Sequence, residues 1–330
     1  MMLIRVNQIF RSYLKQEKML YKVSLPEAYR RICRSAYNMR QRDTNQEKQD
    51  FQDVNMPRVS GKMMHLGLKE HQVANRIVTV GHLGRLKDLV DHLDQPPWFE
   101  CTSERGFVTV TGEFQSIPVS IVCIGMGYPN MDFFLREARE VVEGKMAIIR
   151  FGSCGGIHPS SVVGSLAVSS PGSVMVKRNP DAFRQVQGSQ PVPDQCPHYS
   201  VMLPALSDPV LSDLLYEELQ GKSKFALKGM NISADSFYSS QGRPSKYFDD
   251  CNAEVMSQVK ALYPDALTME METFHLLDLA SNSSNSIVAT AVSLVLANRH
   301  DKRVIDMGLK TLATHQGSSA VLNAITRFQL

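Results

Sequence analysis

Two segments about 120 residues apart contain residue types that bind a sugar and an anion. Segment 148–157 (IIRFGSCGGI) is an apolar strand that continues into an arginine, a small hydroxyl and three glycines. Segment 269–274 (MEMETF) places a methionine and a carboxylate where an apolar strand runs into a helix. An arginine beside free backbone N–H groups binds oxyanions. A carboxylate accepts hydrogen bonds from a vicinal diol, and a methionine packs on a sugar face, so the two segments predict a site for phosphate and a sugar.

The chain has the size and composition of a soluble enzyme, with 330 residues, 43% hydrophobic and 21% charged. Residues 1–48 hold eleven Lys or Arg against four Asp or Glu. We therefore expect residues 1–60 to be a basic, partly helical extension of a single domain, residues 61–330. The expected location is cytoplasmic, and the alternative is import into an organelle through the basic N-terminus. Basic and aromatic residues do not alternate, so no nucleic acid is expected as a partner.

The six cysteines lack CxxC and Cys/His ligand spacing, which argues against a zinc site. Several lie in apolar runs, as expected of core thiols in a reducing compartment. The sequence contains no run of 18 or more apolar residues, so no membrane span is predicted.

Strand-like and helix-like segments alternate after residue 57. Strands are expected at 76–80, 107–111, 118–124, 146–151, 164–170, 225–232 and 286–296. One helix is expected to follow the first strand and end at residue 93. Further helices are expected at 129–143, 208–220, 251–262, 273–280 and 304–327, and a long loop or insertion at 177–200. The alternation predicts an α/β fold, a single domain with a central mixed β-sheet flanked by helices.

Five ordered motifs, from about residue 65 to the C-terminus, resemble the nucleoside phosphorylase-I family, and within it the uridine phosphorylases. The first is 80–85 (VGHLGR), where a glycine ends a strand and an arginine follows four residues later. The resemblance implies a three-layer fold and a phosphate site. That site contains Gly81, Arg85, Arg150 and Ser153, and Arg105 from the neighbouring subunit. His82 stands where bacterial members carry an acid.

The remaining motifs resemble the sugar and base sites of the family. On the ribose, Glu272 is expected to bind the 2′- and 3′-hydroxyls, Met271 to pack on the ring, and His65 to reach the 5′-hydroxyl across a dimer. Glu270 is expected to be a sheet or helix-cap residue. The base site is expected in segment 237–243 (FYSSQGR) with support from the C-terminal region, namely Phe237, Gln241, Arg243 and Arg299.

The resemblance implies reversible phosphorolysis of uridine or 2′-deoxyuridine in pyrimidine salvage. Phosphate is a co-substrate, the products are uracil and ribose 1-phosphate, and the active sites are shared within a homodimer. Purine-specific relatives carry an aspartate near residues 296–297, and no acid stands there. Two alternatives remain: a phosphorylase of thymidine or purine nucleosides, and an inactive nucleoside-binding relative. Gly106 stands where some relatives bind an interface cation through a glutamate, so no cofactor and no catalytic metal are expected.

Overall fold

Runs of valine and isoleucine form the centre of the fold, where three parallel strands lie side by side. The computed structural model describes residues 53–184 and 196–330, and these lie in one unit that extends from Gln49 to Leu330. Strand β3 (Arg76–Val80) pairs in parallel with β6 (Ile117–Cys123) and with β7 (Met146–Gly156). In this register Val80 lies beside both Cys123 and Phe151. The carboxyl ends of all three strands therefore meet at one edge.

The remaining strands extend this sheet in two directions. On one side β6 pairs with β5 (Val108–Phe114) and β5 with β4 (Phe99–Thr102), both antiparallel. On the other side the sheet closes on itself through β7, β12 (Thr268–Glu270), β11 (Ala226–Ala234), β8 (Leu166–Arg178) and β13 (Ile287–Asn298). Strand β13 pairs with both β8 and β7, which completes a ring of five strands. The short strands β9 (Tyr199–Val201) and β10 (Ala205–Leu206) pair with β8.

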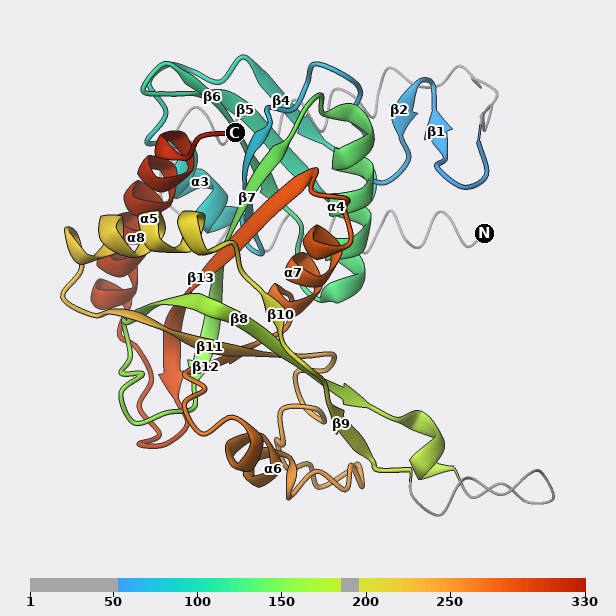
Figure 1. Ribbon diagram of the computed structural model, residues 1–330, viewed down its shortest axis with the longest axis vertical. Helices are drawn as coiled ribbons and strands as arrows, with labels where there is room; N and C mark the ends of the chain where they lie inside the picture. Colours follow the sequence, from blue (N-terminus) through green and yellow to red (C-terminus); the bar gives the residue numbers. More distant parts are fainter. Residues whose placement is uncertain (1–52, 185–195) are drawn as a thin grey trace, which may run out of the picture. The chain divides into compact units, whose positions relative to one another are not determined.

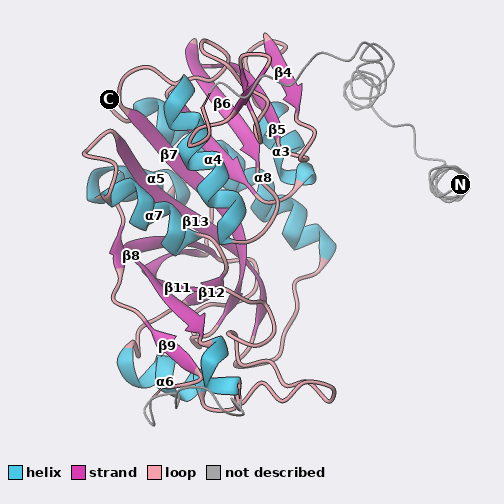
Figure 2. Ribbon diagram, turned by 90° about the vertical axis from the view of Figure 1, so that its right-hand side faces the viewer, coloured by secondary structure: helices cyan, strands magenta, loops and turns pink. Residues whose placement is uncertain are grey.

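Helices cover both faces of the sheet (Figures 1 and 2). Helices α3 (Leu83–Val90), α5 (Pro209–Gln220) and α8 (Met307–Arg327) pack together on one face. Helices α4 (Tyr128–Val141) and α7 (Thr273–Ser281) pack on the other face, and α6 (Val255–Leu262) packs beside β9. The predicted fold, a central mixed sheet flanked by helices, is confirmed. No helix in the described ranges is both long and apolar enough to cross a membrane.

Some predicted boundaries are wrong. The predicted loop 177–200 begins too early, because β8 continues to Arg178, which pairs with Tyr199 of β9. Helix α6 begins at Val255 and not at residue 251, since Cys251 has a φ of 45°, outside the helical region. Sequence patterns did not indicate the short strands β4, β9 and β10 or the hairpin of β1 (Arg58–Val59) with β2 (Lys62–Met63). Most of the predicted extension, residues 1–52, lies outside the described residues, as do residues 185–195.

Candidate active site

Two loops approach each other closely at the carboxyl ends of β3 and β6. A Cβ atom on Gly81 would lie 2.9 Å from the carbonyl oxygen of Gly125, so only glycine fits there. Gly125 and Gly127, after β6, have φ values of 75° and 90°, in the region that favours glycine. This packing brings the backbones of the two loops into direct contact at the strand ends.

Helix α3 begins two residues after Gly81 and carries Arg85 in its first turn, where this side chain contacts β7. His82 caps this helix, because its Nδ1 accepts a hydrogen bond from the backbone N–H of Gly84 at 3.0 Å. The buried Arg85 donates from Nη1 to the carbonyl oxygen of Phe151 at 2.9 Å, and its guanidinium lies 4.9 Å from that ring's centroid. Burial lowers the pKa of Arg85 to about 10, and the charge of Arg150 adds to the effect. Arg85 is therefore protonated at neutral pH and lies near a second cation.

Arg150 lies between two buried carboxylates that come from the end of β12 and the start of α7. Its Nη1 is 3.3 Å from Oε2 of Glu270, and its Nη2 donates to Oε2 of Glu272. A Cβ atom on Gly152 would lie 1.7 Å from Arg150 Nη1, so the glycine makes room for the guanidinium. The structure thus joins two predicted site residues, Arg150 and Glu272, that are far apart in the sequence.

The two carboxylates have different surroundings. Glu270 accepts hydrogen bonds from the backbone N–H groups of Glu272 at 2.9 Å and Thr273 at 3.1 Å, where α7 begins. The prediction that Glu270 is a sheet or helix-cap residue is confirmed. Burial opposes ionisation of Glu270, but Arg150 and the hydrogen bonds from the Ser233 hydroxyl and the Glu272 N–H hold its pKa below the usual value. Burial raises the pKa of Glu272, and the negative charge of Glu270 adds to that shift.

One oxygen of Glu272 also contacts the loop after β6. Its Oε1 accepts a hydrogen bond from the N–H of Gly127 at 2.6 Å. Sequence patterns did not identify this donor, because a backbone N–H has no side-chain signature. Gly125 and Gly127, directly after β6, are the only sign of this contact in the sequence. Ser153 and Met271 are half-buried next to the cluster, beside Gly152 and Glu272 along the chain.

All four predicted base-site residues lie in one connected group. Arg243 Nη2 lies 3.3 Å from the side-chain oxygen of Gln241, and its guanidinium lies 4.1 Å from the centroid of Phe237. Arg299 Nη1 donates to the carbonyl oxygen of Gln241 at 2.7 Å and lies 3.6 Å from Sδ of Met269. Because Met269 belongs to β12, this group adjoins the strand that carries Glu270. Burial lowers the pKa of both arginines, and Arg243 further lowers that of Arg299.

The structure does not bring His65 and Arg105 into this cluster of the same chain. The His65 ring stacks on Phe133 at 4.0 Å, and its Nδ1 lies 2.5 Å from Oε1 of Glu137. The buried Glu137 of α4 also accepts from the backbone N–H of His65, so it orients the imidazole. Arg105 is exposed in the turn between β4 and β5, without a hydrogen bond or ion pair to any residue in the described ranges. Sequence analysis missed Glu137, whose signal is an acid among the buried residues of α4.

The fold is α/β, and Arg85, Arg150, Glu270 and Glu272 form a buried charged cluster near the carboxyl ends of its parallel strands. The chain belongs to the phosphorylase superfamily, which matches residues 75–323.

Three known proteins illustrate the range of its relatives. A solved structure from a study of two diverse uridine phosphorylases of the oomycete Phytophthora capsici is 42% identical, with a TM-score of 0.80. That match covers 85% of this chain and 100% of the other. A uridine phosphorylase of Thermococcus kodakarensis is 24% identical over 72% of this chain and 78% of its own length. A DeoD-type purine nucleoside phosphorylase of Bacillus subtilis is 24% identical over 72% of this chain and 87% of its own length.

Proposed function

We propose that this chain is a uridine phosphorylase, which converts uridine and phosphate reversibly into uracil and ribose 1-phosphate. 2′-Deoxyuridine is a second substrate in this proposal. The observation that carries it is the contact of Arg150 with Glu272, which joins a cation suited to phosphate to a carboxylate suited to a ribose diol. The similarity to the Phytophthora capsici structure supports the same activity.

The proposed phosphate site combines the buried cations of Arg85 and Arg150 with Gly81 and Ser153. A phosphate dianion can present two oxygen atoms to a guanidinium group, and their spacing matches that of two N–H donors. Glu270 would keep its contact with Arg150, and phosphate would replace part of the contact between Arg150 and Glu272. The freed carboxylate oxygen of Glu272 would then accept from the 2′- and 3′-hydroxyls, while Met271 packs on the ring.

The proposed base site recognises uracil through its polar edge. The side chain of Gln241 supplies both a donor and an acceptor, which suits the N3–H and an adjacent carbonyl of uracil. Arg243 would donate to O4, and Phe237 would stack on the ring. Arg299 holds the backbone carbonyl of Gln241 and keeps this segment in place. The positive charges of Arg243 and Arg299 also favour the departure of the base as an anion.

In the proposed reaction a phosphate oxygen forms a bond to C1′ while the bond from C1′ to N1 of the base breaks. Positive charge develops on the ribose ring, and the phosphate below it stabilises that charge. The bonding pair leaves with the base, and uracil takes up a proton afterwards. Arginine contacts at this position act mainly by electrostatic stabilisation and positioning. The proposal requires no organic cofactor and no catalytic metal.

The proposed active unit is a cytoplasmic homodimer in which each chain completes the site of the other. His65 and Arg105 both lie outside the cluster of their own chain, and Arg105 is exposed. In a two-fold symmetric dimer, each chain would present its His65 and Arg105 to the active site of its partner. Glu137 would keep the His65 ring oriented toward the 5′-hydroxyl of the partner's nucleoside.

One assay tests the activity. Purified protein is incubated with uridine in phosphate buffer and in phosphate-free buffer, and uracil is measured by chromatography. We expect uracil release only with phosphate, together with ribose 1-phosphate. Equal release in both buffers would show that the protein hydrolyses uridine. No release in either buffer would favour the inactive nucleoside-binding relative. A parallel incubation with inosine compares a purine substrate, and comparable cleavage of inosine and uridine would contradict pyrimidine specificity.

A further inference from the structure

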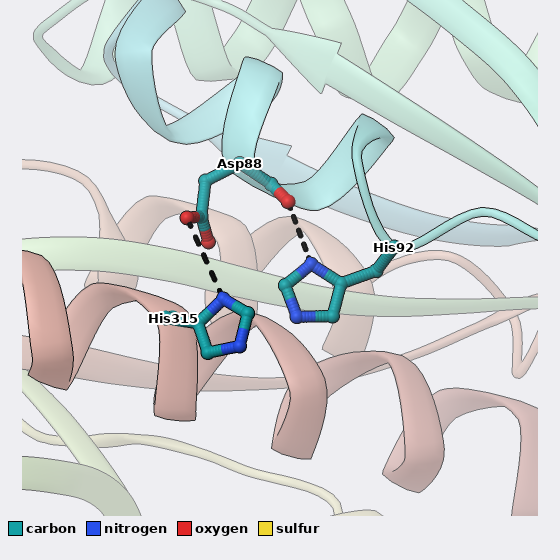
Figure 3. Close-up of side chains that lie close together, drawn as sticks. All are labelled: Asp88, His92 and His315. Atoms are coloured by element: carbon teal, nitrogen blue, oxygen red, sulfur yellow. Dashed lines mark hydrogen bonds and ion pairs between the residues drawn. The ribbon is translucent and has the colours of Figure 1, made fainter.

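Two histidines and an aspartate come together where the end of α3 packs against α8. The first turn of α3 contains the proposed phosphate residue Arg85. Asp88 lies in α3, His92 lies two residues beyond its end, and His315 lies in α8 (Figure 3). One nitrogen or oxygen atom of each residue lies within 4.8 Å of those of the other two. The His315 ring lies at the Asp88 carboxylate and the His92 ring at the Asp88 backbone carbonyl, with the two ring centroids 4.5 Å apart (Figure 3).

Two of these side chains hold buried polar atoms that have no hydrogen-bond partner among the described residues. These atoms are Nε2 of His92 and Oδ2 of Asp88. A buried polar atom without a partner has an unfavourable free energy, so it marks a place where a ligand can bind.

The hydrogen bonds of His92 prepare it to bind a metal. Its Nδ1 lies 2.7 Å from the backbone carbonyl oxygen of Asp88, so Nδ1 carries the proton and Nε2 carries the free lone pair. A histidine whose other ring nitrogen donates to a backbone carbonyl is the usual arrangement in metal sites. The carbonyl groups at the end of α3 add a favourable potential for a cation.

We propose that Asp88, His92 and His315 bind a divalent transition-metal ion of the Zn²⁺ type, which links α3 to α8. Imidazole nitrogens favour such ions, whereas Mg²⁺ and Ca²⁺ prefer oxygen ligands. Bonds of about 2.0–2.1 Å to a tetrahedral ion need donor atoms about 3.4 Å apart. Nδ1 of His315 is 3.9 Å from Oδ1 of Asp88, and this side chain is 65% exposed, so a small rotation completes the site. Water fills the fourth position.

Titration of Zn²⁺ into the EDTA-treated and dialysed full chain tests the site by calorimetry. Wild-type protein should bind one more Zn²⁺ per chain than His92→Gln or His315→Gln, or bind it about tenfold or more tightly. His71→Asn is the matched control, since His71 is exposed and Asn tolerates its φ of 65°. It should bind Zn²⁺ as wild type does. Identical titrations of wild type and His92→Gln, or tighter binding of Mg²⁺ than of Zn²⁺, would overturn the proposal.

Two further measurements separate this site from other ligands and from misfolding. Co²⁺ in the site should give d–d absorption bands without the thiolate charge-transfer band of cysteine ligation. Zn²⁺ should raise the thermal unfolding midpoint of wild type but not that of His315→Gln. Because His315 is exposed, this variant should unfold at the wild-type midpoint in EDTA, which shows that its fold is intact. A strong thiolate band, or equal stabilisation of both proteins by Zn²⁺, would contradict the proposal.

Discussion

Arg150 and Glu272, 122 residues apart in the chain, form a buried ion pair where β7 and α7 meet. Glu270 approaches the same guanidinium from the other side at 3.3 Å. One cation therefore faces two carboxylates, and the three side chains together carry a net negative charge. Arg85 brings this total to zero, and a phosphate dianion bound as proposed would share Arg150 with Glu272. The proposed phosphate and ribose sites are thus coupled through one side chain.

Replacing Arg150 by lysine should weaken phosphate use without unfolding the protein. An ammonium keeps the charge between the carboxylates, but it cannot donate to phosphate and to Glu270 in the planar geometry of a guanidinium. We expect kcat/KM for phosphate to fall by about 10²–10³-fold, measured by initial rates at saturating uridine. Arg327→Lys, at a surface ion pair with Glu218, is the control and should leave the rates unchanged. Wild-type kinetics of Arg150→Lys would exclude Arg150 from the phosphate site.

Gly152→Ala should displace Arg150, although residue 152 touches no substrate in the proposed site. The added methyl group would stand 1.7 Å from Nη1, so the guanidinium must leave its carboxylate partners. We expect turnover to fall about 10²-fold or more, together with a lower thermal unfolding midpoint. Gly221→Ala after α5 is matched to it, because its Cβ would meet nothing nearer than 3.7 Å. If both alanine variants turn over uridine equally, the position of Arg150 does not limit catalysis.

The elements of the domain could be predicted where one local pattern decides them. Strands β3, β6, β7 and β13 are apolar, β-branched runs, and the sequence indicates all four. The closure of the ring could not be predicted, because pairing of β13 with β8 joins segments more than a hundred residues apart. Short strands such as β9, with three residues, are too short to show a periodic pattern of their own.

The site was predictable where side-chain chemistry marks it. Arg150, Glu272 and Gln241 are polar residues in or beside otherwise apolar segments, and the structure buries all three. The N–H of Gly127 and the carboxylate of Glu137 could not be predicted, because their roles depend on which distant segment packs against them. The same reason hides the cluster of Asp88, His92 and His315. Its third member, His315, lies in α8, which is the last helix in chain order.

The raised pKa of Glu272 predicts how nucleoside binding depends on pH. The carboxylate must be ionised to accept from both ribose hydroxyls, and protonation therefore weakens binding as pH falls. Because burial raises the pKa of Glu272, the loss should begin at a higher pH than for an exposed glutamate. Calorimetry of uridine binding between pH 5 and 8 without phosphate measures it, and Glu272→Gln should bind weakly at every pH. A wild-type affinity that is constant over this range contradicts the assignment.

Stability should respond to pH in opposite directions for the two carboxylates. The folded state holds the proton of Glu272 more tightly than the unfolded state, so its contribution to the free energy of unfolding is lost as pH rises through its folded pKa. Glu270 has a lowered pKa, so its contribution is lost as pH falls. Urea unfolding of Glu270→Gln from pH 4 to 8 should therefore show its largest deficit from wild type at neutral pH. A deficit that grows toward pH 4 would reverse the assignment of the two shifts.

Gln241→Ala should impair pyrimidine substrates selectively. It removes a buried donor and acceptor from the proposed uracil edge, at a cost of about 1–3 kcal/mol in transition-state binding. This corresponds to a fall of about 5- to 150-fold in kcat/KM for uridine, while KM for phosphate should change little. Arg243→Ala should act in the same direction. A variant with the wild-type kcat/KM for uridine would exclude Gln241 from the base site.

Mixing two inactive variants tests whether the active sites are shared between chains. Arg105→Ala removes the proposed contribution to the partner's site, and Glu272→Ala removes a contribution to its own, so each homodimer should be nearly inactive. A mixed dimer then has one site with both defects and one with neither. Random exchange makes about half of the dimers mixed, so activity should recover to about a quarter of wild type. Subunit exchange is verified with differently tagged chains. If the exchanged mixture stays as inactive as its parents, Arg105 does not act in the partner's site.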